Sequence, residues 1–171
     1  QLDGVIVRCG FGSNGEDSRF KENINGLNDA GIPYGVYIYS YAENENEAAN
    51  EAKNVIRLLK SCSAHLTYPI YYDLEANKYT SHLTKSEYTK IVASFMSTLE
   101  NAGYTNAKVY SYLYLLTGKL SASSVIPYVD WVAQYYDVCQ YTLGDYSGWQ
   151  YSSSGSVPGI SGNVDMNVWF K

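Results

Sequence analysis

The sequence predicts an α/β fold, with a mainly parallel sheet that carries helices on its outside and is either open or closed into a barrel. Two observations support this class. Short apolar runs alternate with amphipathic stretches as far as about residue 120, a pattern typical of parallel sheets with crossover helices. Strand patterns then follow with little helix between them. The length of 171 residues fits a single domain over residues 1–171.

The first half of the chain predicts two strands and two helices. The apolar run at residues 5–7 predicts a buried strand, followed by a glycine-rich loop. Apolar side chains at helical spacing predict a helix over 20–30 that ends at Gly31, where glycine fits a left-handed cap. Strict alternation over 34–41 predicts a strand, with its tyrosines on one face. Helical spacing returns at 48–59.

The second half begins with a strand at 69–75. Thr84, with Glu87 three residues later, forms a capping box and opens a third helix. A strand over 108–112 and a short helical stretch over 113–120 follow. The remaining expected elements are late strands at 131–135, 149–151 and 164–169, with the Ser/Gly-rich stretch 152–162 as a loop before the last of them.

Composition excludes several functions. The net charge is −5 and Lys and Arg form no cluster, so we expect no nucleic-acid partner. No window approaches the roughly 18 apolar residues of a membrane span, and no signal peptide is expected within the chain. His65 and His82 lie 17 positions apart, and we expect no metal site. Cys9, Cys62 and Cys139 form no C-x-x-C pattern, which leaves one disulfide or three free thiols open.

Tyrosine is the compositional anomaly, with 19 of 171 residues. A tyrosine ring buries a large apolar face while its hydroxyl still needs a hydrogen-bond partner. Sugars present flat C–H faces edged with hydroxyl groups, so a tyrosine-lined groove suits a carbohydrate. A compositional habit of the source organism explains the count equally well.

The sequence Tyr-Tyr-Asp-Leu-Glu is the sharpest chemical signal. Alternation along a strand places Asp73 and Glu75 on one face, with Tyr71 below them, at the end where parallel α/β folds carry their active sites. Two carboxylates whose Cα atoms lie about 6–7 Å apart cannot both ionise easily in a semi-apolar pocket, so one pKa rises. Glycoside cleavage requires such a pair. A metal-ligand pair and a helix cap are the other interpretations of this motif.

Several blocks together resemble the glycoside hydrolase family 25 lysozymes, the Chalaropsis-type muramidases. These blocks are VIVRCGFG, AGIPYGVYIYSYAENENEA, YPIYYDLE, VDWVAQY, WQYSSSGSVPGISG and VDMN, and together they cover nearly all of residues 3–169. The resemblance implies an irregular TIM-like (β/α) barrel with few helices in its C-terminal part. It implies hydrolysis of the β-1,4 bond between N-acetylmuramic acid and N-acetylglucosamine in peptidoglycan. It also implies no cofactor, glycan strands as the partner, and an extracellular or cell-wall location.

Roles follow from the resemblance residue by residue. Glu75 matches the general acid that later activates water, and Asp73 matches the carboxylate that stabilises developing positive charge. The implied mechanism is retaining, with the substrate's acetamido group attacking the anomeric carbon and Asp73 orienting it; a direct carboxylate nucleophile is the competing account. Asp165 matches a late-strand aspartate of the carboxylate network. The expected sugar contacts, for each of which core packing is the other interpretation, are Tyr37, Tyr39, Tyr110, Tyr112, Trp149 and Gln150.

The resemblance has one departure. The family pattern opens with a further strand whose aspartate joins the catalytic group, whereas the run at residues 5–7 matches the second strand and Asp3 does not match that aspartate. Two barrel edges are therefore expected to be unpaired, which predicts possible self-association through them. The alternative function is a catalytically impaired domain of the same fold that binds cell-wall carbohydrate.

Overall fold

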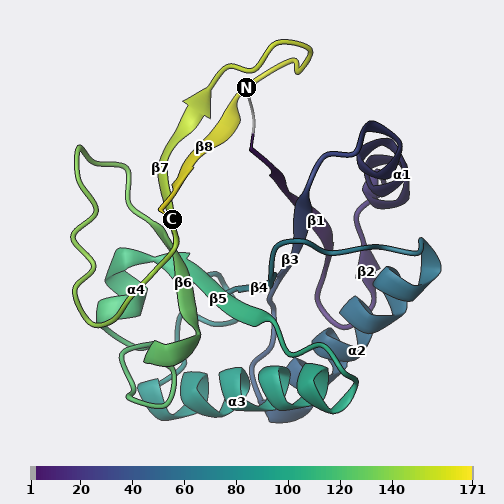
Figure 1. The fold of residues 1–171 in the computed structure, drawn as a ribbon. Coiled ribbons are helices and arrows are strands. Elements are labelled where there is room, and N and C mark those ends of the chain that lie inside the picture. The colour runs from purple at the N-terminus through teal and green to yellow at the C-terminus, as the bar shows by residue number, and fades with distance from the viewer. Residues whose placement is uncertain (1–2, 171) are drawn as a thin grey trace.

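The computed structural model describes residues 3–170, which form one curled eight-stranded sheet with helices on its convex side (Figure 1). The strand order is β2-β1-β3-β4-β5-β6-β7-β8. The strands are β1 (Val5–Phe11), β2 (Gly15–Glu16), β3 (Tyr34–Tyr39), β4 (Ile70–Asp73), β5 (Ala107–Tyr112), β6 (Val129–Ala133), β7 (Gly148–Gly155) and β8 (Val164–Trp169). The helices are α1 (Phe20–Ala30), α2 (Glu45–Ser61), α3 (Lys85–Asn101), α4 (Leu113–Thr117) and the short 3-10 helix η1 (Ile126–Tyr128).

The predicted α/β class and the parallel sheet are confirmed in their coarser form. Strands β1 and β3 to β7 run parallel, whereas β2 and β8 pair antiparallel at the two ends of the sheet. Within residues 3–170 the sheet is a curled half-barrel that does not close, because β1 and β8 are not paired. Figure 1 shows the open side between them. Self-association through these edges stays a prediction.

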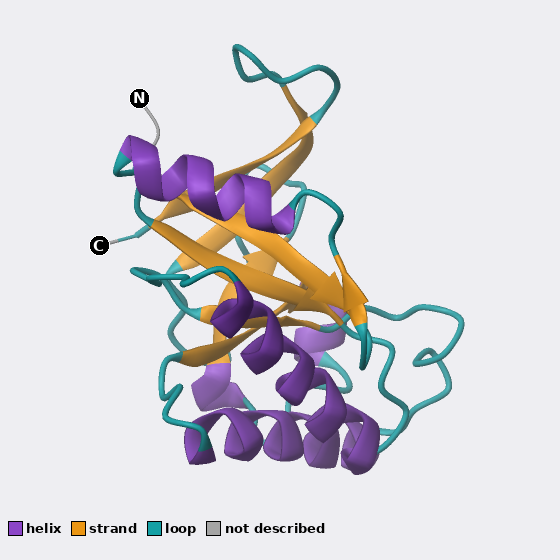
Figure 2. Ribbon diagram, turned by 90° about the vertical axis from the view of Figure 1, so that its right-hand side faces the viewer, coloured by secondary structure: helices purple, strands orange, loops and turns teal. Residues whose placement is uncertain are grey.

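The C-terminal part differs from the expected loop at 152–162. The first four of these residues continue β7, because β7 and β8 form a long antiparallel hairpin with register shifts after Gln150 and Ser152. The hairpin extends beyond the rest of the sheet (Figures 1 and 2). Helix is sparse after α4, as expected, with only η1 in the described residues that follow.

The convex face of the sheet carries the main core. Alternate side chains of β4, Ile70 and Tyr72, face α2 and α3, and Tyr72 stacks on Phe95 of α3 with ring centroids 3.7 Å apart. Figure 2 shows both helices packed against one side of the strands. Burial of such aromatic faces is a large apolar contribution to folding. The remaining alternate side chains of each strand therefore point to the concave face.

The concave face holds a second, smaller cluster, which is aromatic. Trp131 lies at its centre, with Tyr71 and Tyr110 in edge-on or tilted contact at 5.1 and 4.4 Å between ring centroids. The Tyr71 hydroxyl donates a 2.8 Å hydrogen bond to Asp130. This cluster fills the lower interior of the half-barrel, so the carboxyl ends of the strands carry the accessible part of that face.

The predicted helix ends are confirmed. Gly31 adopts φ 64° at the end of α1, in the left-handed region that favours glycine. The capping box of α3 is complete, because the Thr84 side chain accepts from the backbone of Glu87 and the Glu87 side chain accepts from the backbone of Thr84. None of the helices among residues 3–170 is both long and apolar enough to cross a membrane.

The cysteine question left open by the sequence also has an answer. Cys9, Cys62 and Cys139 are all free thiols. Cys9 is buried on the convex side of β1, and burial raises its pKa to about 12, so it packs as a small apolar side chain. No disulfide contributes to the stability of the described residues.

Candidate active site

Asp73 ends β4 on the concave face and is 4% exposed. Its Oδ1 atom has no hydrogen-bond partner among the described residues, which is rare for a buried oxygen. Burial raises the pKa of Asp73 well above its usual value. The negative charge of Glu75 raises it further, while Arg8 opposes the shift. The structure therefore holds a protonatable carboxyl group with an unused oxygen.

Glu75 follows two residues later, just past the end of β4, and is half-buried. The Tyr39 hydroxyl donates a hydrogen bond of 3.3 Å to its Oε2 atom. Burial raises the pKa of Glu75, this hydrogen bond lowers it, and repulsion from Asp165 raises it again. A carboxyl group with a raised pKa, open to solvent on one side, is suited to general acid–base chemistry.

The segment that carries the two carboxyl groups is fixed by its neighbouring strands. The backbone of Leu74 donates to Tyr110 of β5, and the backbone of Ser40 donates to Asp73, at 3.1 and 3.0 Å. Beyond the strand, the Thr80 hydroxyl donates to the carbonyl of Glu75 at 2.6 Å. These bonds hold Glu75 in place although it lies outside the sheet ladder.

Asp165 lies on β8, the strand at one end of the sheet that borders the open side of the half-barrel, and is exposed. Partial burial raises its pKa, and its charge contributes to the raised pKa of both Asp73 and Glu75. The structure thus brings the three predicted carboxyl groups within electrostatic reach of one another. Asp165 makes no side-chain hydrogen bond to Asp73 or Glu75.

The four tyrosines predicted from strand alternation share the concave face. Tyr37 and Tyr39 project from β3, and Tyr110 and Tyr112 project from β5, on either side of β4. Tyr110 is buried and donates a 2.8 Å hydrogen bond to Gln150. The other three are partly exposed, and the pKa of each is raised by burial, so the phenols stay neutral donors at ordinary pH.

Trp149 and Gln150 face opposite ways because they are consecutive in β7. Gln150 lies on the concave face, 3% exposed, and its Oε1 accepts hydrogen bonds from Tyr110 and Tyr135. Trp149 pairs with Val132, a residue of the convex core, and its indole donates to the carbonyl of Gln134. The structure brings Gln150 into the tyrosine wall and leaves Trp149 on the other side of the sheet.

Three further residues belong to this site and were not predicted from the sequence. Arg8 of β1 forms an ion pair of 2.6 Å with Asp17 and lowers the pKa of Asp73. Asn77 donates to the Tyr39 hydroxyl at 3.5 Å and to the carbonyl of Ser40 at 3.2 Å. Tyr135 reaches Gln150 from the loop after β6. Alternation in β1 could have found Arg8, since Val7 and Cys9 face the convex core; the two loop residues carry no such signal.

The fold and this site together define a class of protein. A pair of protonatable carboxyl groups among tyrosines on a concave sheet face, at the carboxyl ends of parallel strands, is the arrangement of a carbohydrate-cleaving enzyme. The sequence profile of "Glycosyl hydrolases family 25" matches residues 2–160. The chain belongs to glycosyl hydrolase family 25.

Known relatives agree with this assignment. The modular autolysin LytC from Streptococcus pneumoniae, whose structure is solved, is 44% identical to this chain with a TM-score of 0.93, over 99% of this chain and 41% of that one. An autolytic lysozyme of Clostridium acetobutylicum is 28% identical over 163 residues, 95% of this chain and 47% of that protein. The chain thus spans less than half the length of these two relatives. The spore cortex lytic enzyme SleM of Clostridium perfringens, 19% identical over 99% of this chain and 60% of its own, shares the fold with a TM-score of 0.85.

Proposed function

We propose that this domain is a lysozyme that hydrolyses the β-1,4 bond between N-acetylmuramic acid and N-acetylglucosamine in peptidoglycan. One observation carries the proposal: Glu75, with a raised pKa, lies beside a buried Asp73 that has an unpaired oxygen. Membership of family 25 and similarity to an autolysin and an autolytic lysozyme support it. LytC has also been solved in complex with a synthetic peptidoglycan ligand. The site of action we propose is the cell wall or the extracellular medium.

In this proposal Glu75 is the acid–base residue. Its raised pKa increases the protonated fraction at any given pH above that of an ordinary glutamate, and the protonated form gives a proton to the oxygen of the leaving sugar. The resulting carboxylate then removes a proton from the attacking water. The Tyr39 hydroxyl stabilises that carboxylate through its hydrogen bond to Oε2.

Asp73 supports the reaction through its unpaired oxygen. In the proposed retaining mechanism the acetamido group of the substrate attacks the anomeric carbon and its N–H donates to Oδ1 of Asp73. The positive charge that develops on the acetamido group favours the ionised form of Asp73, which is costly in the empty site. Direct attack requires the ionised form of Asp73, which burial disfavours, so these features favour assistance by the substrate over direct attack by Asp73. Asp165 adds negative potential from β8.

The sugar rings would rest against the concave tyrosines. Tyr37, Tyr39 and Tyr112 offer partly exposed ring faces and hydroxyl donors, which match the C–H faces and oxygens of a sugar. Tyr110 and Gln150 are buried and hydrogen-bonded to each other, so they support the concave tyrosine surface from below. Trp149 is not part of this proposal, because its ring lies on the convex side of β7.

The identity of the new chain end tests the proposal. Purified peptidoglycan is incubated with the domain, the released ends are reduced with borohydride, and the reduced sugars are identified after acid hydrolysis. We expect reduced muramic acid. Reduced glucosamine would contradict the assigned bond. Retention of the folded domain on peptidoglycan without release of ends would favour the catalytically impaired wall-binding alternative.

A further inference from the structure

Three exposed aromatic rings lie beside the candidate active site, at or past the carboxyl ends of β1, β3 and β4. Phe11, Tyr41 and Tyr79 are each 38% exposed. The ring of Tyr41 lies edge-on to both of the others, with centroid distances of 6.2 Å to Phe11 and 5.3 Å to Tyr79. We call these three rings the aromatic ridge. Exposed rings gathered in this way mark an interaction surface more often than rings scattered singly.

The ridge is continuous with the catalytic site through one residue. Tyr39 donates its hydroxyl hydrogen bond to Glu75, and its ring lies 5.3 Å from that of Tyr41. A ligand that extends from Glu75 past Tyr39 therefore meets Tyr41 next and then Tyr79 or Phe11.

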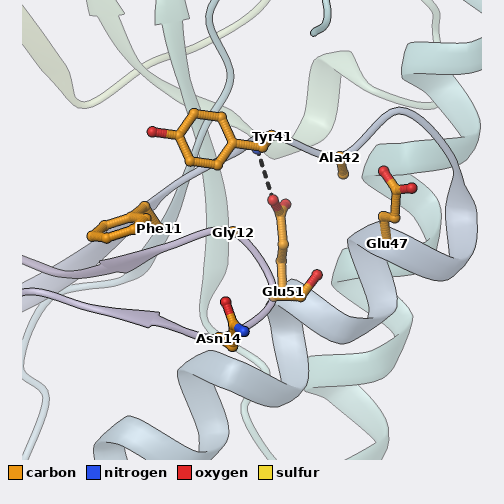
Figure 3. A pocket seen from close by; sticks show the side chains of 8 residues that line it. Phe11, Gly12, Asn14, Tyr41, Ala42, Glu47 and Glu51 are labelled. Atoms are coloured by element: carbon orange, nitrogen blue, oxygen red, sulfur yellow. Dashed lines mark hydrogen bonds between the residues drawn. The ribbon is translucent and has the colours of Figure 1, made fainter.

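The position of Tyr41 is fixed from below by a buried acid that the proposed chemistry does not use. Glu51 of α2 is 1% exposed, and its Oε1 accepts from the backbone N–H of Tyr41 at 2.7 Å. Its Oε2 accepts from Tyr72 at 2.6 Å and from Ser40 at 2.8 Å. Figure 3 shows this carboxylate bonded directly beneath Tyr41. The backbone that carries the ring is thus held in place before any ligand arrives, which lowers the entropy cost of binding.

The position of Tyr79 is fixed by the loop that follows Glu75. The side chain of Asn77 accepts from the backbone N–H groups of Tyr79 and Thr80, at 2.8 and 3.2 Å. The Lys78 ammonium lies over the Tyr79 ring, 4.7 Å from its centroid. The same loop therefore carries Glu75 at one end and a ridge ring at the other.

A recess of about 320 Å³ adjoins the ridge and adds polar groups to it. Phe11 and Tyr41 form its apolar wall, and Ser13, Asn14 and Glu47 line it as well (Figure 3). Apolar ring faces beside a few hydrogen-bonding groups suit a sugar. The carboxylate of Glu47 in the lining disfavours an anionic group at this spot, so an uncharged sugar ring fits the recess better.

From these contacts we propose that the aromatic ridge is a distal subsite for the glycan strand, holding an N-acetylhexosamine ring beyond the two that flank the cleaved bond. The proposal rests on the proposed function, since the strand bound by the ridge is the one cleaved at Glu75. Long strands reach the ridge, whereas short fragments that occupy only the positions next to Glu75 do not. The ridge thus sets a preference for chain length.

Tyr79→Ala tests the ridge, because Tyr79 is exposed and its ring can be removed without opening the core. We expect kcat/KM on long glycan strands to fall about tenfold, equivalent to about 1.4 kcal/mol, with little change on the disaccharide of N-acetylmuramic acid and N-acetylglucosamine, whose two rings fill only the positions that flank the cleaved bond. Tyr79→Trp should restore most of the loss, because it restores a ring face. Tyr151→Ala is the matched control: Tyr151 is also 38% exposed but packs beside Trp149, away from the ridge.

Equal losses on long and short substrates, or no loss on either, would overturn the ridge proposal. A binding measurement separates the two proposals. The affinity for long strands is compared between the Glu75→Gln variant and the double variant that carries both Glu75→Gln and Tyr79→Ala. Failure of the unchanged chain to cleave any substrate would reject the proposed function alone. In that case, weaker binding of long strands by the double variant would still support the ridge as a glycan site, and an unchanged affinity would reject it.

Discussion

The Tyr39 hydroxyl donates a hydrogen bond of 3.3 Å to Oε2 of Glu75, although the two residues are 36 positions apart in the chain. Strand pairing produces this contact, because Tyr39 pairs with Asp73 in the parallel ladder of β3 and β4. The bond opposes the effect of burial on Glu75, lowering a pKa that burial raises. The acid strength of Glu75 is therefore set mainly by its burial and by the opposing hydrogen bond from Tyr39 on the neighbouring strand β3.

Removal of that hydrogen bond should move the pH dependence of hydrolysis. Tyr39→Phe takes away the contact that stabilises the Glu75 carboxylate, so the pKa of Glu75 should rise. A general acid must be protonated to act, so the alkaline limb of kcat/KM against pH should shift to higher pH. Tyr104→Phe, far from the site, serves as the control. A shift to lower pH in Tyr39→Phe would contradict the assignment of Glu75 as the acid.

Asp73 should lower the free energy of unfolding of the domain at neutral pH. Its folded pKa is raised well above the usual 3.8, so its stabilising contribution is complete below about pH 4 and is lost as the pH rises through the folded value. Each unit of such a shift corresponds to about 1.4 kcal/mol. Asp73→Asn should therefore be more stable than the unchanged chain at pH 7, and its stability should fall less between pH 4 and 7. Urea unfolding at several pH values measures both.

Destabilisation by Asp73→Asn at pH 7, with an unchanged pH slope, would show that folding does not raise the pKa of Asp73. Asp3→Asn is a suitable control, because Asp3 is an exposed aspartate outside the site.

Glu51 should contribute to stability through the three hydrogen bonds that its carboxylate accepts. Glu51→Gln replaces one accepting oxygen by an amide that donates, and so leaves a donor of Tyr72, Ser40 or Tyr41 without its partner. An unpaired buried polar group costs about 1–3 kcal/mol, and we expect a loss of that size in urea unfolding. Glu45→Gln, on the exposed first turn of the same helix, should change stability by much less. Similar small changes in both variants would contradict a structural role for the buried carboxylate.

Side-chain alternation made much of the concave face predictable. Asp73 lies on the same face as the tyrosines of β3 and β5, because paired residues on neighbouring parallel strands point to the same side of the sheet. The same rule separates Gln150 from Trp149, which a match to the Trp-Gln-Tyr block alone does not do. Helix starts and ends were predictable where a specific cap chemistry is present, as at Thr84 and Gly31.

Features set by tertiary pairing were not predictable in this way. The extension of β7 into a serine-rich stretch depends on its antiparallel partner β8, and serine and glycine carry little strand preference. Glu51 falls on the apolar face of α2, three residues after Ala48, where periodicity alone favours an apolar side chain. Its burial depends on donors from two other elements. The contacts of Asn77 and Tyr135 depend on loop conformations that sequence patterns leave open.

The most direct test of the central claim compares Glu75→Gln with the unchanged chain on one preparation of peptidoglycan. Glutamine preserves the shape of Glu75 but cannot supply a proton, so we expect release of reducing ends to fall by at least about 100-fold, within the range for loss of a general acid. Binding to peptidoglycan should be retained. Glu100→Gln, an exposed change on α3, should match the unchanged chain. Substantial release by folded Glu75→Gln would contradict the assignment of Glu75 as the acid–base residue.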